Sequence, residues 1–142
     1  MTNTLRQQRR ANLRRLMKPE HIAFVGGSHL ERVVGLCRDN GYAGRMSIIN
    51  PRYETLAGLH CVPTADDLDD APDAAFVAMS NQLTLEAVQA LAKRGAGGVI
   101  CHATGYGETG GEGMEAQNAL ARAAGEMALI GPNCMGLINA FD

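Results

Sequence analysis

The sequence predicts an α/β fold in which a five-stranded parallel sheet lies between two layers of helices. Two observations predict it. Five short apolar runs, of four to seven residues each, alternate along the chain with segments of good helix formers. Such runs, when bounded by turn residues, are typical of strands that are buried on both faces. The connections are also short, which favours right-handed crossovers that put helices on both faces of the sheet.

The first predicted element is a helix over Leu5–Met17, because this segment is rich in good helix formers. Pro19 ends it, since proline and the residue before it resist the helical conformation. Leu13, Leu16 and Met17 are spaced i, i+3 and i+4 and form one narrow apolar stripe. We expect this stripe to pack on the rest of the protein.

The charge distribution changes after this helix. Residues 1–18 contain six basic side chains and no acidic one, whereas the remaining 124 residues have a net charge of −8. We therefore predict a basic N-terminal helical arm (1–18) and a main domain (19–142). The arm is either a solvated helix docked on that domain or a contact for an anionic partner, such as a membrane surface or RNA. Because aromatic residues are not interleaved with the arginines, no nucleic-acid partner is expected.

Two strands are predicted at the start of the main domain. His21–Val25 is the first, because its apolar run leads into the turn Gly26-Gly27-Ser28. A helix over Glu31–Asn40 follows, and Gly41 ends it as a left-handed cap residue. The second strand is Met46–Ile49, which ends at an Asn-Pro pair.

The middle of the chain is predicted to hold one strand and one long helix. Tyr53–Val62 contains a glycine and is expected to be a loop, and Asp66–Leu68 begins a short helix. Asp73–Met79 is the third strand. A helix over Leu83–Arg94 follows, with a serine and an asparagine available as caps.

The last part of the chain repeats the pattern. Val99–Ala103 is the fourth strand and Thr104–Gly113 is a glycine-rich loop. Met114–Glu126 is a helix, and Met127–Ile130 is the fifth strand. The predicted strand order is 3-2-1-4-5, a half-Rossmann arrangement within a three-layer sandwich.

The cysteines and the hydropathy of the sequence indicate the cellular environment of the protein. Cys37, Cys61, Cys101 and Cys134 form no CxxC pair and lie among apolar residues, which predicts reduced thiols in a cytoplasmic protein, with no disulfide and no metal site. No run of 18 apolar residues is present, so no membrane span is expected, and no signal peptide is evident.

The candidate site lies where the strands end, because ligands bind outside the carboxyl ends of strands in such sheets. After the first strand, Gly26–Ser28 lets backbone N–H groups approach an anion at a helix N-terminus. The alternative is a tight turn without a ligand. The dinucleotide pattern GxGxxG is absent, because in a pattern that starts at Gly26 the third and sixth positions are Ser28 and Glu31 and not glycine.

The second strand end argues against NAD. An NAD-binding domain has an acidic residue there, whereas this chain has Asn50, Pro51 and Arg52. Arginine pairs with a phosphate monoester through two parallel hydrogen bonds. NADP and coenzyme A (CoA), which both carry such a phosphate, are therefore the ligands that remain.

Five segments together resemble a known family. They read KPEHIAFVGGS, GYAGRMSIINPR, PDAAFVAMS, GGVICHATGYGETGGEG and LIGPNCMGLIN. In this order and spacing they resemble the N-terminal CoA-binding domain of the NDP-forming acyl-CoA synthetases, which is related to the succinyl-CoA synthetase alpha subunit. The resemblance runs from about Leu16 to Asn139 and implies a Rossmann-like fold that binds CoA.

The resemblance implies a division of labour along the strand ends. The first turn would contact the CoA phosphates or adenosine, and the second the ribose or its 3′-phosphate. The third would line the middle of the pocket, and the last two would lie toward the thiol and acyl end. The implicated residues are Gly26, Gly27, Ser28, Asn50, Pro51, Arg52, Met79, Ser80, Thr104, Gly105, Asn133 and Cys134.

The same resemblance implies that the chain holds no catalytic residue of its own. In the family, a phosphohistidine domain and an ATP-grasp domain carry the chemistry, and both would be further domains or partner subunits. The chain departs from the family at Gly27, where alanine is common, and in the helix Gly35–Gly41, which is about one turn short. It departs also at His102, which is either a hydrogen-bonded histidine at a strand end or a proton acceptor near a thiol.

Three functions are consistent with the sequence. The first is the CoA-binding domain of a larger acyl-CoA synthetase, whose next domain would begin near Asn139. The second is a free-standing module that binds or senses CoA, which a stop codon after Asp142 would favour. The third is an NADP-dependent oxidoreductase module, against which the missing GxGxxG pattern argues.

Overall fold

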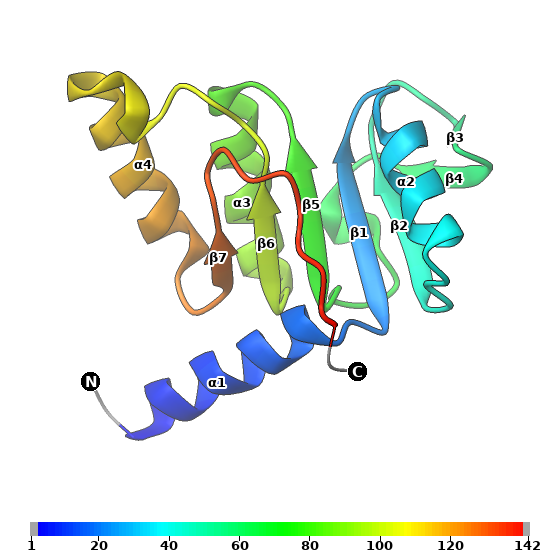
Figure 1. The fold of residues 1–142 in the computed structure, drawn as a ribbon, viewed down its shortest axis with the longest axis horizontal. Helices are drawn as coiled ribbons and strands as arrows, with labels where there is room; N and C mark the ends of the chain where they lie inside the picture. The colour runs from blue at the N-terminus through cyan, green and yellow to red at the C-terminus, as the bar shows by residue number, and fades with distance from the viewer. Residues whose placement is uncertain (1–2, 141–142) are drawn as a thin grey trace.

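The computed structural model describes residues 3–140 and confirms the α/β class (Figure 1). A seven-stranded sheet has the order β3-β4-β2-β1-β5-β6-β7, and every neighbouring pair is parallel except β3 and β4. The strands are β1 His21–Gly26, β2 Arg45–Ile49, β3 Thr55–Leu56, β4 Leu59–Val62, β5 Ala74–Ala78, β6 Gly98–Cys101 and β7 Ala128–Ile130. The helices are α1 Asn3–Met17, α2 Leu30–Asp39, η1 Ala65–Asp67, α3 Asn81–Arg94, η2 Gly107–Thr109 and α4 Gly111–Ala124.

The four long helices and five strands predicted from the sequence all form, with ends that differ by three residues or fewer. The predicted loop over Tyr53–Val62 is wrong, because this segment is the β3–β4 hairpin. Its two-residue turn places Ala57 at φ 52° and Gly58 at φ 74°, as a two-residue hairpin turn requires. Leu56 and Cys61 are buried, so the hairpin joins the core.

The predicted strand count and order were therefore wrong in detail. The order 3-2-1-4-5 put Ala74–Ala78 outside β2, but this strand pairs with β1 from Ile22 to Gly26. The place beside β2 belongs to β4. When β4 is counted as the third strand, the parallel strands follow the order 3-2-1-4-5-6, which is the doubly wound arrangement.

Helices cover both faces of the sheet. On one face, α3 and α4 pack over β5 and β6, where Val77, Leu91, Val99 and Leu120 are fully buried. On the other face, α2 packs over β1 and β2, and residues 131–140 run down across the sheet toward the end of α1 (Figure 1). There the Asn139 side chain donates to the Met17 carbonyl at 3.0 Å.

Helix α1 lies across the amino ends of the strands (Figure 1). The predicted stripe is only partly correct, because Leu16 is 2% exposed whereas Leu13 is 49% exposed. The helix packs instead through Asn12, Arg15 and Leu16, a face rotated from the predicted one. Gly98 permits this approach, since a Cβ there would lie 2.9 Å from Leu16 Cβ. None of the described helices is both long and apolar enough to cross a membrane.

Candidate functional site

The twelve predicted site residues lie together at the carboxyl edge of the sheet, because Gly26 is the last residue of β1 and each of the others follows the end of a parallel strand. Eleven of them are partly or fully exposed, and Gly26 is buried. Side-chain and backbone contacts connect each strand end to the next one across the sheet. The edge is therefore one continuous surface that spans β2, β1, β5, β6 and β7.

Asn50 connects the ends of β2 and β1. Its side-chain Nδ2 donates to the Gly26 carbonyl at 2.5 Å, and its Oδ1 accepts a hydrogen bond from the Arg52 backbone N–H at 2.7 Å. Asn50 thus shapes the loop through both ends of its amide. The Arg52 side chain is exposed and makes no ion pair or hydrogen bond among the described residues, so it remains available to an anion.

Gly26 connects the ends of β1 and β5. A Cβ at this position would lie 2.9 Å from the Ala78 carbonyl oxygen and 2.9 Å from Nε2 of His29. Only glycine fits this close approach. Helix α2 begins at Leu30, so its positive dipole end faces the same turn, although the N–H groups of Leu30 and Glu31 already donate to the Gly27 and Ser28 carbonyls at 3.0 and 3.1 Å.

The loop after β6 depends on two residues that the sequence analysis did not assign to the site. Asn81, considered there only as a helix cap, donates through Nδ2 to the Gly105 carbonyl at 2.9 Å and so connects β5 to β6. The Glu108 carboxylate accepts hydrogen bonds from the N–H groups of Gly105 at 2.6 Å and Tyr106 at 3.1 Å. Hydrogen bonds from its own N–H and that of Gly105 lower the pKa of Glu108.

The segment after β7 turns back over the end of β6. Asn133, at φ 57°, donates its N–H to the Ala103 carbonyl at 2.9 Å, and the N–H of Cys134 donates to the Cys101 carbonyl at 3.1 Å. The Cys134 carbonyl in turn accepts a hydrogen bond from Nδ1 of His102 at 3.2 Å. The predicted pair Asn133 and Cys134 is thereby fixed beside the β6 exit.

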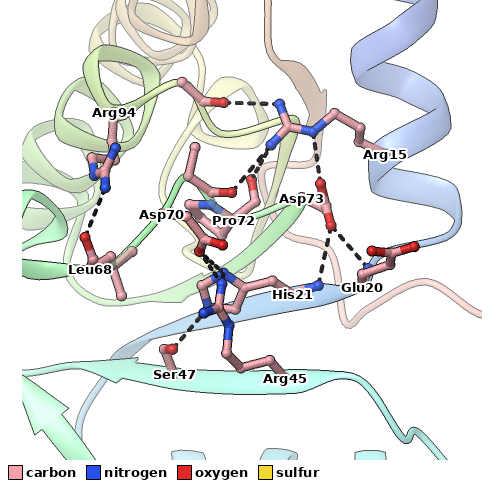
Figure 2. Close-up of polar contacts among 12 residues, drawn as sticks. Arg15, Glu20, His21, Arg45, Ser47, Leu68, Asp70, Pro72, Asp73 and Arg94 are labelled. Carbon is pink, nitrogen blue, oxygen red and sulfur yellow. Dashed lines mark hydrogen bonds and ion pairs between the residues drawn. The ribbon is translucent and has the colours of Figure 1, made fainter.

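A second cluster of charged groups lies at the opposite edge, and Asp73 is at its centre (Figure 2). Asp73 accepts hydrogen bonds from Arg15 Nε at 2.8 Å and from the N–H groups of Glu20 at 3.0 Å and His21 at 3.2 Å. Burial raises the pKa of Asp73, but these hydrogen bonds outweigh it and hold the pKa below its usual value. The carboxylate therefore anchors α1 to the start of β1.

His21 is the other centre of that cluster (Figure 2). Its Nε2 lies 2.8 Å from Ser47 Oγ, and its Nδ1 contacts both Arg45 and Asp70, which also pair with each other. Burial, and then the charge of Arg45, lowers the pKa of His21. Because each of these groups has a partner inside the cluster, we assign it to stability and not to ligand binding. Two cavities, of about 320 and 540 Å³, also lie beside α1 and away from the carboxyl edge.

No group of three His, Cys, Asp or Glu side chains among residues 3–140 is placed to hold a metal ion. The contacts of the carboxyl edge are hydrogen bonds of loops and turns, and the N-termini of α2, α3 and α4 lie at this edge together with Arg52, whose side chain has no partner among residues 3–140. This arrangement suits the binding of an extended anionic ligand.

Comparison with known families assigns the fold and its ligand class. The family described as the CoA binding domain matches residues 20–140. The chain belongs to the CoA-binding domain family. It is homologous to the CoA-binding part of the ADP-forming acyl-CoA synthetases, which are larger proteins.

Curated relatives show how much larger these proteins are. A trans-feruloyl-CoA synthase from an unknown prokaryotic organism is 31% identical over 135 residues, which cover 90% of this chain and 19% of that protein. An ADP-forming acetate–CoA ligase of Archaeoglobus fulgidus is 28% identical over 132 residues, covering 89% of this chain and 19% of the ligase. This CoA-binding domain thus spans about a fifth of the length of these two relatives.

A solved structure supports the same family assignment. The apo form of a dinucleotide-forming acetyl-coenzyme A synthetase from Ca. Korarchaeum cryptofilum superposes with a TM-score of 0.80 at 29% identity, over 87% of this chain and 28% of that chain. A hypothetical protein from Pyrococcus horikoshii OT3 shares the fold with a TM-score of 0.64 at 21% identity, over 89% of this chain and 86% of its own.

Proposed function

We propose that this CoA-binding domain binds CoA along the carboxyl edge of its sheet. The observation that carries the proposal is the exposed Arg52, whose guanidinium has no partner among the described residues and whose backbone is connected to the end of β1 through Asn50. An arginine there offers two parallel hydrogen bonds to a phosphate monoester, and the Gly26–Ser28 turn offers backbone N–H groups to the pyrophosphate. Met79, Ser80, Thr104, Gly105, Asn133 and Cys134 would then line the path of the pantetheine arm.

We propose further that the domain serves an ADP-forming acyl-CoA synthetase, in which an acid, CoA and ATP give acyl-CoA, ADP and phosphate. The homology to such enzymes and the small share of their length that this chain spans support this role. A phosphohistidine domain and an ATP-grasp domain would come from further polypeptide or a partner subunit. The chain by itself is expected to bind CoA without forming acyl-CoA. A cytoplasmic location fits the four cysteines, none of which is in a disulfide.

The free-standing module is the second candidate function. The Pyrococcus horikoshii protein supports it, since a chain of similar length carries this fold by itself. Coding sequence that continues past Asp142 in frame would favour the synthetase, and a stop codon there would favour the module.

Calorimetric titration with CoA, and with NADP in parallel, tests the ligand. Binding of CoA without binding of NADP is the expected result, because the chain has the CoA family's turns and lacks GxGxxG. Binding of NADP alone, or of neither ligand, would contradict the proposal.

Arg52→Ala tests the position of the ligand. We expect CoA to bind about 1.5–3 kcal/mol more weakly, the range for a hydrogen bond to a charged group. Dephospho-CoA should be nearly unaffected if Arg52 contacts the 3′-phosphate. Arg122→Ala, an exposed arginine at the end of α4, is the matched control and should leave both affinities unchanged. An equal loss for both ligands would contradict the assignment to the 3′-phosphate.

A further inference from the structure

The His102 side chain is held in place from two neighbouring segments. Directly after β6, its backbone N–H donates to the Val77 carbonyl of β5 at 2.9 Å. Its ring lies beside the ring of Phe76, with the centroids 5.8 Å apart, and its Nδ1 lies 3.2 Å from the Cys134 carbonyl oxygen. The ring is half-buried, so its orientation is set by these contacts.

The hydrogen bond to Cys134 fixes which ring nitrogen carries the proton. A carbonyl oxygen can only accept, so Nδ1 must be the donor, and in the neutral ring Nε2 keeps its lone pair. Nε2 has no hydrogen-bond partner among the described residues and is open to solvent. No charged group of the described residues pairs with the ring; Phe76 and the Cys134 carbonyl are its contacts.

The strand order determines which part of a bound ligand would reach this ring. The inference rests on the proposed function, in which the phosphate-bearing end of CoA lies at the ends of β1 and β2. β6 is three strands away from β2 in the sheet, a span of roughly 14 Å at ordinary strand spacing. The pantetheine arm, extended along the carboxyl edge, would carry the thiol toward β6 and β7.

We infer that His102 is the proton acceptor for the thiol of bound CoA. The S–H proton moves to Nε2, the sulfur keeps the electron pair of the broken bond, and the products are a thiolate and an imidazolium. The thiolate is the nucleophilic form of a thiol, and a nearby imidazole is an ordinary means of producing it. The hydrogen bond from Nδ1 to Cys134 keeps Nε2 free for this proton and stabilises the charged ring.

His102→Asn separates this role from a purely structural one. The asparagine Nδ2 can replace Nδ1 as the donor to the Cys134 carbonyl, but the side chain has no basic nitrogen. His60→Asn is the matched control, because His60 is exposed on β4, four strands away from β6. CoA affinity is measured first by calorimetry and should be the same, within about twofold, in the wild type and both variants.

The test of the proton transfer is the alkylation of bound CoA by iodoacetamide, with protein in excess and the carbamidomethyl-CoA product quantified by chromatography. The readout is the pH midpoint of the rate, since shielding of the thiol scales the rate but leaves the midpoint unchanged. We expect the midpoint for bound CoA to lie about one pH unit below that of free CoA, equivalent to roughly tenfold more thiolate near neutral pH. The midpoint should return to the free value in His102→Asn and stay low in His60→Asn.

Two results would overturn the inference while leaving CoA binding established. One is a midpoint for bound CoA equal to that of free CoA, and the other is a low midpoint that persists in His102→Asn. A calorimetric titration that shows no CoA binding would overturn the proposed function itself, and this inference with it. The two failures are therefore distinguishable in the same set of samples.

Discussion

Replacement of Leu16 by alanine is expected to destabilise the domain by about 3 kcal/mol. Leu16 is 2% exposed and packs against Gly98 at the start of β6. A fully buried leucine costs about 2–5 kcal/mol when cut back to alanine, because transfer free energy is lost and a cavity remains. A value near the lower middle of this range is expected, since Leu16 lies at the edge of the sheet and its surroundings can partly close the space.

Leu13→Ala provides the matched control. Leu13 lies on the same helix and is 49% exposed, so its removal should cost less than about 1 kcal/mol. Urea denaturation followed by far-ultraviolet circular dichroism measures both variants. With a denaturant dependence of about 2 kcal/mol per molar, Leu16→Ala should lower the midpoint by about 1.5 M urea.

Equal midpoint shifts in the two variants would refute the reasoning. In that case α1 would not be docked on the sheet in solution, and residues 1–18 would be a separate arm, as the charge distribution suggests. A large shift in Leu16→Ala alone would instead make α1 an integral part of the folded unit, with only its outer residues available to a partner.

Three further predictions use the same denaturation assay. Gly98→Ala should destabilise the domain by about 1–3 kcal/mol, because the added Cβ would lie 2.9 Å from Leu16 Cβ. Gly35→Ala, in the middle of α2, should stabilise it by about 0.5–1 kcal/mol, because the added Cβ meets open space; the opposite ranking of the two variants would contradict the packing. Burial and the charge of Arg45 lower the pKa of His21, so just below pH 6.5 the unfolded chain binds a proton at this residue and the folded chain does not. The free energy of unfolding should therefore fall as the pH drops through that range, and it should fall less steeply in His21→Gln; parallel curves of stability against pH for the two proteins would contradict this. Hydrogen bonds hold the pKa of Asp73 below 3.8, so the ionised carboxylate stabilises the fold above that pH and the stabilisation is lost below it. Asp73→Asn should therefore be less stable than the wild type at neutral pH and approach its stability in acid; a stability difference that does not change with pH would show that the charge of Asp73 does not stabilise the fold.

Sequence periodicity predicted the parallel strands well, because each is a short apolar run buried on both faces. It failed at the hairpin β3–β4, where the strands have two and four residues and the turn is Ala57-Gly58. An asparagine at the first turn position is the usual signal for such a turn, and alanine conceals it. The missed strand also displaced the predicted order, since the position beside β2 was assigned to the next strand in sequence.

The gathering of the twelve candidate residues at one edge was predictable, because the ends of parallel strands meet there. The roles of single side chains were not. The contact of Asn50 with a ligand stays a prediction, and the hydrogen bonds of its amide to the Gly26 carbonyl and the Arg52 N–H were not foreseen from the sequence. The apolar stripe on α1 was misassigned because two contacts with distant parts of the sequence orient this helix. They are the hydrogen bond from Arg15 to Asp73 and the packing of Leu16 against Gly98. Local spacing carries no information on such long-range contacts.

The two ends of the sheet limit how copies of this chain can associate. One edge strand, β3, has two residues and is antiparallel to its neighbour, and the other, β7, has three. Such short edges present few unpaired backbone groups to a strand of another molecule, so they protect against growth of the sheet from one molecule to the next. Association between copies, or with other subunits, should therefore use side-chain surfaces of helices and loops, and concentrated samples should resist β-rich aggregation as long as the fold is intact.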